Sequence, residues 1–372
     1  MADRGSKYRK IFETLQREIR EGRYPAGVAL PSEERLVRRF GVSRITAVKA
    51  MDELVKQGLV FRKRGAGTFA TREARNESGQ IGLIVPGLAY GEIFPLIVQE
   101  LARIAQRDGY SLLLGDISAP SPMKRAHEAC RLARRFVESR VAGVVFQPLA
   151  FLKTPDRVSR EILSMFKEAN IPVVILDRDI ASVDAPHDFV GIDNLAAGRM
   201  VGAHMMERGA KRIHFLMKPN CASVIRDRLD GVRSVLAGRL PKDHLIVAKA
   251  DDAKALAKWF RRARRPDAVI CESDYVAARF MATLAKFGLS VPGDVMVSGF
   301  DDVRYAEITN PPLTTVHQPC GDIADMVYRA LRERMRDRDM PSRKILLPAP
   351  LVVRGSTGGA VRAKQVNNPG GF

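Results

Sequence analysis

The sequence predicts an α/β protein in which a small helical head with a basic hairpin precedes a larger, two-lobed region of doubly wound parallel sheets. Three observations support this prediction. The chain has 372 residues, more than one hydrophobic core usually serves. Helical periodicity followed by a basic hairpin pattern occupies residues 1–71. From residue 81 onward, short apolar runs alternate with helical patterns, which is typical of parallel sheets covered on both faces.

Composition places the chain among globular proteins, with 46% hydrophobic and 28% charged residues. No apolar run approaches the ~18 residues of a membrane-spanning helix, and the N-terminus lacks the pattern of a secretory signal. We therefore expect a soluble, cytoplasmic protein. The cysteines at 130, 221, 271 and 320 are too far apart for a CxxC pair or a zinc knuckle. We expect them to be reduced core residues, and we expect no metal and no cofactor.

Positive charge is concentrated at the front of the chain. The formal net charge is +19, and residues 1–75 hold 18 Lys and Arg against 9 Asp and Glu. The remaining 297 residues hold 43 basic against 33 acidic residues, so the charge excess is several-fold denser at the front. A generally basic protein with solvated charges would explain the excess in the longer segment. The concentration in the first fifth instead favours a nucleic acid as partner.

Two helices are expected before the break at Gly41 and Val42. Apolar residues from Tyr8 to Ile19 recur at helical spacing, and the pattern stops near Gly22. Ser32 is expected to cap a second helix, because Glu33 and Glu34 then lie in its first turn, at the positive end of the helix dipole.

A third helix is expected from Ser43, as its cap, to about Gln57, with Gly58 as its C-terminal stop. Its apolar residues are expected to point inward: Ala47, Met51, Leu54 and Val55. The side chains left to face outward at or near its N-terminal end are Arg44, Ile45, Thr46 and Lys49. Three helices joined by short turns make a helix-turn-helix, in which this end enters the major groove of DNA.

A basic hairpin, or wing, is expected after the third helix. The short apolar runs Leu59–Phe61 and Thr68–Ala70 flank the turn RKRGAG. Arg64 beside Gly65 would bring a cationic tip and bare backbone close to phosphates or a minor groove. Solvated surface charge is the alternative interpretation of Arg62 and Lys63.

Residues 7–71 resemble the GntR-type winged helix-turn-helix. The stretch LPSEERLVRRFGVSRITAVKAMDELVKQGLVFRKRGAGTFA carries the resemblance, through its SEE, GVSR, DEL, QGL and GxGTF elements. It implies base and phosphate contacts by Arg44 and Thr46, although an ordinary surface arginine is the alternative for Arg44. Two positions depart from the family. The family often has Arg where Val48 stands, and Val48 is expected to face the core. The order Glu34 then Arg35 is shifted relative to the family, so the operator preference of relatives cannot be copied. The predicted DNA-binding residues are Arg35, Ser43, Arg44, Ile45, Thr46, Lys49, Arg64, Gly65 and Thr68.

The chain behind the head is expected to form two similar lobes facing a cleft, because about a dozen strand candidates are too many for one small sheet. The polar residues 72–79, without apolar periodicity, are expected to be a linker. The expected boundaries are 1–71 for the head, about 80–183 and 317–344 for the first lobe, about 184–316 and 345–356 for the second lobe, and 357–372 for a disordered tail.

Polar side chains follow several expected strands, at the place where doubly wound sheets bind ligands. Gln147 follows the run that ends at Phe146, and Asp177 follows the run that ends at Leu176. Paired Arg and Asp side chains can read vicinal hydroxyls, which favours a polyhydroxylated ligand. The set is completed by Arg178, Arg226, Arg228, Ser273, Asp274, Asp301 and Asp302.

Residues 80–356 resemble the LacI/GalR-type effector-binding core, which is similar to periplasmic sugar-binding proteins. The stretches IPVVILDRD, VGIDNLAAGRMVGAHMMERGAKRIHFL, RDRLDGVRSVL, VPGDVMVSGFDD and NPPLTTVHQP carry the resemblance in the family's order. It implies that Arg228, Asp177 and Asp301 grip the effector and that Phe94 lines the pocket. Ser273 replaces a common Asn, which weakens any copied sugar identity. Arg178 stands where some relatives stack an aromatic ring on a base, so a nucleobase is disfavoured.

Other interpretations stay open for several of these residues. Asp274 is at least as well explained as a helix cap, Asp302 is assigned to a turn, and Asp193 with Asn194 is expected to cap a helix. Arg226 could pair with a neighbouring Asp on the surface. For Gln147, a contact with the ligand and a purely structural role are equally favoured. The predicted effector-binding residues are Phe94, Gln147, Asp177, Arg178, Arg228, Ser273 and Asp301.

A GntR-type head on a LacI-type sensor is similar to the arabinose-repressor type of bacterial regulator, and the chain lacks the minor-groove hinge helix that usually accompanies such a sensor. We expect a repressor of a carbohydrate-utilisation operon that binds a pseudo-palindromic operator as a homodimer and responds to a sugar-like effector. A phosphorylated, acidic or non-sugar ligand is the alternative. An enzyme is not expected, because the sequence lacks GxGxxG after the first strand, GxxxxGK[ST], GxSxG and HExxH. A transport protein would not need the basic head.

Overall fold

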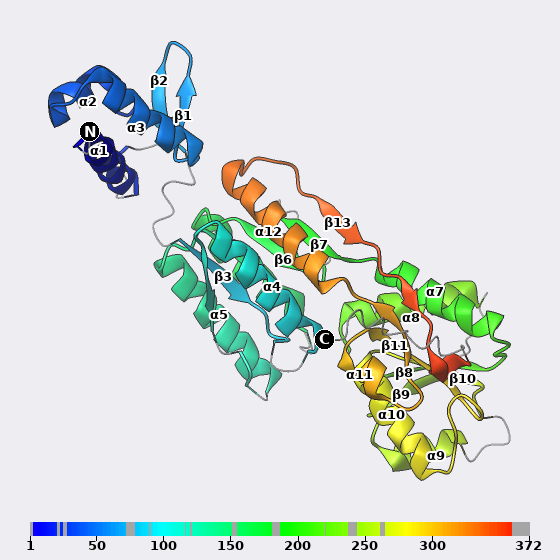
Figure 1. The fold of residues 1–372 in the computed structure, drawn as a ribbon. Coiled ribbons are helices and arrows are strands. Elements are labelled where there is room, and N and C mark those ends of the chain that lie inside the picture. Colours follow the sequence, from blue (N-terminus) through cyan, green and yellow to red (C-terminus); the bar gives the residue numbers. More distant parts are fainter. Residues whose placement is uncertain are drawn as a thin grey trace, which may run out of the picture.

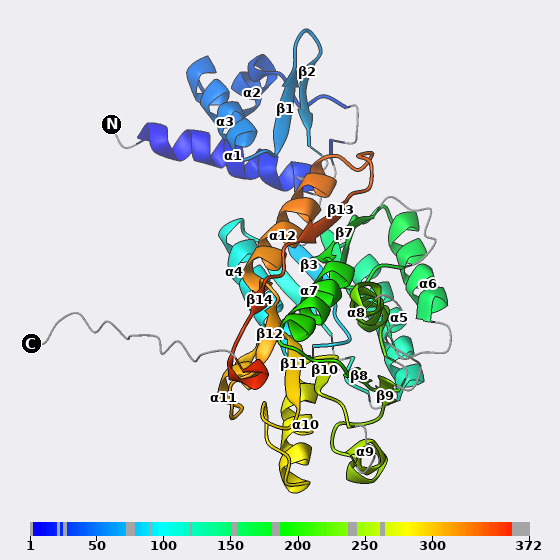
Figure 2. The same ribbon diagram turned by 90° about the vertical axis from the view of Figure 1, so that its right-hand side faces the viewer.

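A computed structural model describes residues 3–20, 23–24, 28–71, 79–88, 91–115, 117–119, 121–150, 155–180, 187–219, 221–236, 244–260 and 265–358. In both views the head lies beyond the first lobe, at the end opposite the second lobe (Figures 1 and 2). Most of the predicted linker and tail lies outside the described residues. Within the described part of the chain, no helix has the length and apolarity to cross a membrane.

The head consists of three helices and a two-stranded wing: α1 (Asp3–Arg20), α2 (Glu33–Phe40), α3 (Arg44–Lys56), β1 (Val60–Lys63) and β2 (Gly67–Ala70). Ser32 and Ser43 cap α2 and α3 by accepting hydrogen bonds from the backbone N–H of Arg35 and Thr46, respectively. Apolar side chains of all three helices form one core, which includes Ile11, Leu15, Leu36, Met51 and Leu54. Val55 was predicted to face inward but is 37% exposed, because Met51 and Leu54 already fill the inner face of α3.

The first lobe is a parallel six-stranded sheet with the order β13-β7-β6-β5-β3-β4. Its strands are β3 (Gln80–Ile84), β4 (Ser111–Leu114), β5 (Gly143–Phe146), β6 (Val173–Leu176), β7 (Asp188–Ile192) and β13 (Lys344–Leu347). Helices α4 (Ile93–Arg107) and α12 (Cys320–Arg336) share an apolar cluster on one face of the sheet. Helices α5 (Pro122–Glu138) and α6 (Pro155–Glu168) cover the other face.

The second lobe repeats this plan with the order β14-β12-β11-β10-β8-β9. Its strands are β8 (Ile213–Met217), β9 (Leu245–Val247), β10 (Ala268–Cys271), β11 (Met296–Asp301), β12 (Thr314–His317) and the antiparallel β14 (Leu351–Val352). One face packs on α7 (Asn194–Glu207) and α8 (Ser223–Val235). The other packs on α9 (Ala253–Phe260) and α10 (Asp274–Lys286), and α11 (Arg304–Ile308) follows β11. The predicted fold class is confirmed.

The lobe boundaries differ in detail from the prediction. Residues 184–316 were assigned to the second lobe, yet β7 pairs with β6 and β13 in the first sheet. Residues from 345 were also assigned to the second lobe, yet β13 lies in the first sheet. The chain therefore passes between lobes after Ile192, between His317 and Cys320, and between Leu347 and Leu351. Hydrogen-bonded pairing decides strand membership, and apolar runs alone do not reveal it.

Candidate functional site

The N-terminal turn of α3 presents a mixed cationic and apolar surface. Arg44 is exposed, and Ile45 is 82% exposed, which is unusual for so large an apolar side chain. The hydroxyl of Ser43 lies 2.9 Å from that of Thr46, so these two polar groups fix the start of the helix. Lys49 is engaged with α1, because its Nζ lies over the ring of Tyr8 at 4.6 Å. A helix start with an Arg that has no ionic partner in the described ranges and with an exposed Ile can contact base edges and thymine methyl groups.

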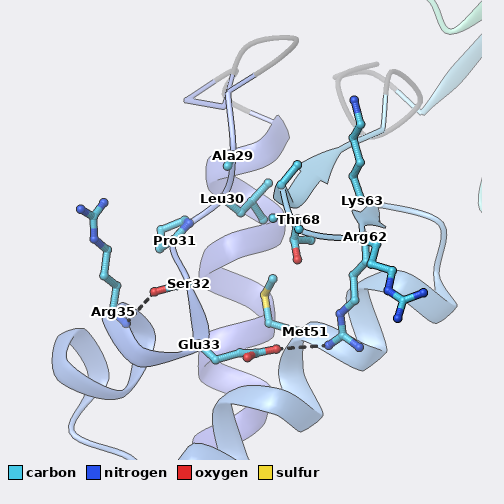
Figure 3. A pocket seen from close by; sticks show the side chains of 14 residues that line it. Ala29, Leu30, Pro31, Ser32, Glu33, Arg35, Met51, Arg62, Lys63 and Thr68 are labelled. Atoms are coloured by element: carbon cyan, nitrogen blue, oxygen red, sulfur yellow. Dashed lines mark hydrogen bonds and ion pairs between the residues drawn. The ribbon is translucent and has the colours of Figure 1, made fainter.

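A groove of about 690 Å³ separates the wing from the start of α2. Figure 3 shows Arg35 on one side of this groove and Lys63 with Arg62 on the other. Gly65 forms the wing tip with φ of +75°, a left-handed conformation that glycine adopts without strain. Of the predicted DNA-binding residues, Arg35, Arg64, Gly65 and Thr68 line this groove, and the other five lie at the cap and outer face of α3.

In the second lobe, Arg228 is buried at 3% exposure and is held on several sides. Its Nε donates to Asn194 Oδ1 at 2.8 Å, and its Nη1 donates to the carbonyl of Glu272 at 2.8 Å. Its Nη2 lies 3.6 Å from Asp301 Oδ1, and the guanidinium covers the ring of Phe300. Arg228 is therefore fixed in orientation before any ligand binds.

Two glycines let α7 and α8 approach closely enough to place Arg228 there. A Cβ at Gly198 would lie 2.0 Å from the carbonyl oxygen of Arg228, and a Cβ at Gly231 would lie 2.1 Å from that of Leu195. Only glycine fits at such separations. The close contact between the helices thus fixes the backbone on which Arg228 stands.

Asp301 ends β11 with φ of +114°, an unusual conformation for a residue with a side chain. Gln318, buried in the segment that returns to the first lobe, donates to Asp301 Oδ1 at 2.7 Å. Burial raises the pKa of Asp301 to about 6, although the charge of Arg228 and the hydrogen bond from Gln318 oppose the shift. A strained, partly compensated carboxylate of this kind is typical of ligand sites.

The first lobe contributes a second carboxylate after β6. Asp177 adopts φ of +68°, and its Oδ2 accepts from Gln147 Nε2 at 3.2 Å and Arg178 Nε at 3.3 Å. Gln147 in turn accepts from the backbone N–H of Gly87, against which the buried ring of Phe94 packs. Three of the predicted effector residues, Gln147, Asp177 and Arg178, therefore lie at the carboxyl ends of the neighbouring strands β5 and β6, and the ring of Phe94 packs beside them.

The two lobes approach each other at this level of the fold. The charge of Asp177 contributes to raising the pKa of Asp301 in the other lobe. Glu92, at the start of α4, forms an ion pair with Arg304 of α11 at 3.4 Å. The polar groups of the two sheets thus face a common region between the lobes.

The structure corrects the interpretation of Asp274 as a helix cap. Ser273 is the cap of α10, because its Oγ accepts from the N–H of Val276. Asp274 is fully buried and instead accepts from Thr315 Oγ1 at 2.6 Å and from the N–H of Val303 at 3.1 Å. Burial raises the pKa of Asp274 to about 8, and the nearby charge of Asp301 adds to the shift. Asp274 therefore supports the turn that carries Asp301.

Other residues have roles that the sequence analysis left open or missed. Asp302 occupies a turn with φ of +54°, where it pairs with His317 at 2.9 Å and Arg354 at 2.7 Å. Asp193 caps α7 as expected, but Asn194 instead orients Arg228. Gln318 was also missed; it lies at the start of the segment 317–344 that was assigned to the first lobe. For Asn194 the available signal was its position two residues after the end of β7. No group of three or more potential metal ligands occurs among the described residues.

Two family models match the chain. A model of bacterial regulatory proteins of the gntR family matches residues 7–70, and a model of the periplasmic binding protein-like domain matches residues 203–357. The arabinose metabolism transcriptional repressor of Halalkalibacterium halodurans is 28% identical over 97% of this chain and 99% of its own length. The ribose operon repressor of the same organism is 24% identical over 93% of this chain and 99% of its own length.

Solved structures show the same fold. A transcriptional regulator of the LacI family from Sanguibacter keddieii is 28% identical, with a TM-score of 0.62, over 76% of this chain and 99% of its own. A complex of the transcriptional regulator CelR with cellobiose has a TM-score of 0.64 at 23% identity over 88% of this chain and 100% of its own, which supports the fold alone.

Proposed function

We infer that this chain is a transcriptional repressor controlled by a sugar-like effector. Its head matches the model of bacterial regulatory proteins of the gntR family, and the region behind it matches the model of a periplasmic binding protein-like domain. It is a regulator and not an enzyme, like the relatives that it matches along nearly its whole length. One observation carries the proposal: a single chain joins an exposed, cationic helix start to a preorganised Arg and Asp set at the ends of two facing sheets.

The charges of the sensor favour an uncharged, polyhydroxylated effector. Arg228 faces Asp301, and Arg178 faces Asp177, so each cation of the candidate site already has a carboxylate beside it. A phosphorylated or acidic ligand would need an uncompensated cation, whereas vicinal hydroxyls can donate to the carboxylates and accept from Arg228. The names of the relatives point to the same class, since they include arabinose and ribose repressors.

The effector controls DNA binding by linkage. The effector can change the affinity of the head for DNA only if it binds one arrangement of the lobes more tightly than the other, and the ratio of these two affinities limits the change. We propose that the chain acts in the cytoplasm as a homodimer on a pseudo-palindromic operator, because one head contacts too few bases for specific binding and a twofold pair reads two half-sites.

Thermal unfolding of the full chain with a panel of ligands tests the effector class. The panel contains arabinose, ribose, cellobiose, a sugar acid and a sugar phosphate, each at the same ionic strength. Binding to the native state raises the melting temperature, so we expect a selective rise with one neutral sugar. A rise only with the charged ligands, or no rise with any member, would contradict a neutral-sugar effector.

Selection of duplex DNA from a random-sequence pool tests the other half of the proposal. We expect the wild-type chain to enrich an inverted repeat and the effector found above to change the affinity for it. Enrichment of no common sequence would contradict operator binding, and a non-repeated sequence would contradict the dimer.

A further inference from the structure

Arg62 is held by carboxylates from two different helices. Its Nη2 lies 2.9 Å from Asp52 Oδ1 of α3 and 3.4 Å from Glu33 Oε1 of α2. Figure 3 shows the Arg62 side chain reaching from the wing toward the start of α2 and meeting Glu33. From the sequence alone, a solvated surface charge was the alternative interpretation of Arg62, whereas in the structure its side chain joins β1 to α2 and α3.

We propose that Arg62 is a positioning residue of the DNA-binding head, which fixes the wing relative to the recognition helix, and that it does not contact DNA phosphates. This inference rests on the proposed DNA binding of the head. A planar guanidinium can engage two carboxylates at once in a fixed geometry. In doing so, it joins the strand beside the wing tip directly to the helix that reads bases.

Strand alternation explains why Arg62, and not its neighbours, takes this role. Successive side chains of a strand point to opposite faces, so Arg62 lies on the same face as Val60, which is buried in the head core. Phe61 is 49% exposed and stacks on Phe69 of β2 at 5.7 Å. Lys63 and Arg64 are exposed and have no acidic partner within the part of the chain that the structure describes. Their charges are therefore available for phosphates.

The wing needs such an attachment because it is short. Its two strands have four residues each, and a two-stranded hairpin is marginally stable by itself. Its backbone is tied to the head by the N–H of Leu30, which donates to the carbonyl of Thr68 at 2.7 Å, and by a bridge between Ala29 and Phe69. Both backbone ties involve β2, whereas β1 is attached by the buried Val60 and by the contacts of Arg62.

Replacement of Asp52 should change the affinity for DNA in the direction opposite to the usual effect of removing a carboxylate. Removing a carboxylate from a surface that faces DNA normally strengthens binding, because repulsion of the phosphates falls. Here Asp52→Asn removes a partner of Arg62, so we expect it to weaken binding by roughly two- to fivefold. The probe is the duplex that the wild-type chain selects from a random pool. Glu53→Gln is the matched control: Glu53 lies on the same helix but accepts from Gln57 and, within the described residues, forms no ion pair with the wing, so binding should stay equal or tighten.

Salt dependence separates positioning from phosphate contact. We expect Arg62→Gln to weaken binding without changing the slope of log K against log salt, whereas Arg64→Gln should reduce that slope by about 1. The double variant Asp52→Asn with Arg62→Gln should bind no more weakly than Arg62→Gln alone. Melting curves of each variant confirm that the head is folded.

The possible failures are distinguishable. Equal or tighter binding by Asp52→Asn, or a slope change for Arg62→Gln as large as that for Arg64→Gln, overturns the positioning role and leaves the repressor function intact. A wild-type chain that enriches no duplex overturns the repressor function and the role of Arg62 with it.

Discussion

The guanidinium of Arg228 lies 3.6 Å from the carboxylate of Asp301, while its Nε is bound to Asn194 at 2.8 Å. Asn194 begins α7, Asp301 ends β11, and Arg228 lies near the middle of α8. The arrangement leaves Asp301 with its hydrogen bond from Gln318 and an attractive charge at a longer distance. A ligand hydroxyl can therefore join the pair without displacing a strong existing bond.

Replacement of Arg228 by Ala should abolish the response to the effector. The variant lacks the guanidinium that can donate to ligand hydroxyls, and Asp301 loses the positive charge of Arg228 beside it. We expect the ligand-induced rise in melting temperature to disappear while binding to the selected duplex persists. Arg226→Ala is the matched control, since Arg226 is exposed on the same helix. Asn194→Ala keeps the charge of Arg228 but frees its orientation, so it should weaken the effector response without removing it. A full response in the Arg228 variant would show that the pocket lies elsewhere.

Replacement of Gly198 by Ala should damage the same site from a distance. The new methyl group would lie 2.0 Å from the carbonyl oxygen of Arg228, so α7 and α8 must separate. Overpacking of this kind costs about 1–3 kcal/mol, and displacement of Arg228 should weaken effector binding as well. Gly321→Ala provides the control, because it lies in a helix with nothing within 4 Å of the new Cβ; alanine there should leave stability unchanged or raise it by about 0.5–1 kcal/mol. Denaturant unfolding of both variants measures the difference.

Local signals in the sequence predicted local structure well. Ser32 and Ser43 cap the helices that they were expected to cap, because an N-cap depends on a side chain and a backbone group three residues apart. Alternation of short apolar runs with helical patterns likewise predicted the doubly wound sheets, because it is also a local pattern of the sequence. The strands β12 and β14 were not singled out, since one has the polar sequence TTVH and the other has two residues. Their pairing depends on partners far away in the chain.

The candidate effector site was predicted in part. Asp177, Arg228 and Asp301 follow strands or match a motif, and the structure gives each of them several polar partners. Asn194 and Gln318 also lie in matched stretches but were not singled out, because their roles arise from contacts with residues 34 and 17 positions away, respectively. Long-range packing, which no local pattern encodes, decides which polar side chain orients another.

Asp274 should make the stability of the chain depend on pH. Burial raises its pKa to about 8 in the folded state, and Asp301 and Asp302 add to the shift. An unfolded Asp titrates near 3.9, so between these values the folded state holds the proton more often than the unfolded state. Stability must then fall as pH rises from about 4 to about 8. We expect Asp274→Asn, which cannot ionise, to gain stability relative to the wild-type chain between pH 5 and pH 8. A stability difference that is constant over this range, measured by denaturant unfolding, would contradict a protonated Asp274.

Replacement of Arg44 by Ala should weaken operator binding by ~1–3 kcal/mol if the side chain reads a base edge. Arg44 occupies the first residue of α3, is exposed, and has no ionic partner among the described residues, so its donors are available to DNA. Arg9→Ala is a control with the same change in charge: Arg9 is exposed on α1 and lies 4.0 Å from Glu13. Loss of a base contact should relax the preference for one base pair of the half-site, whereas loss of general charge should weaken all duplexes alike. Affinities for the selected duplex and for single-base variants of it separate the two effects. Equal losses for every duplex, or losses matched by the Arg9 variant, would remove Arg44 from the set of base-reading residues and leave it a phosphate contact or a solvated charge.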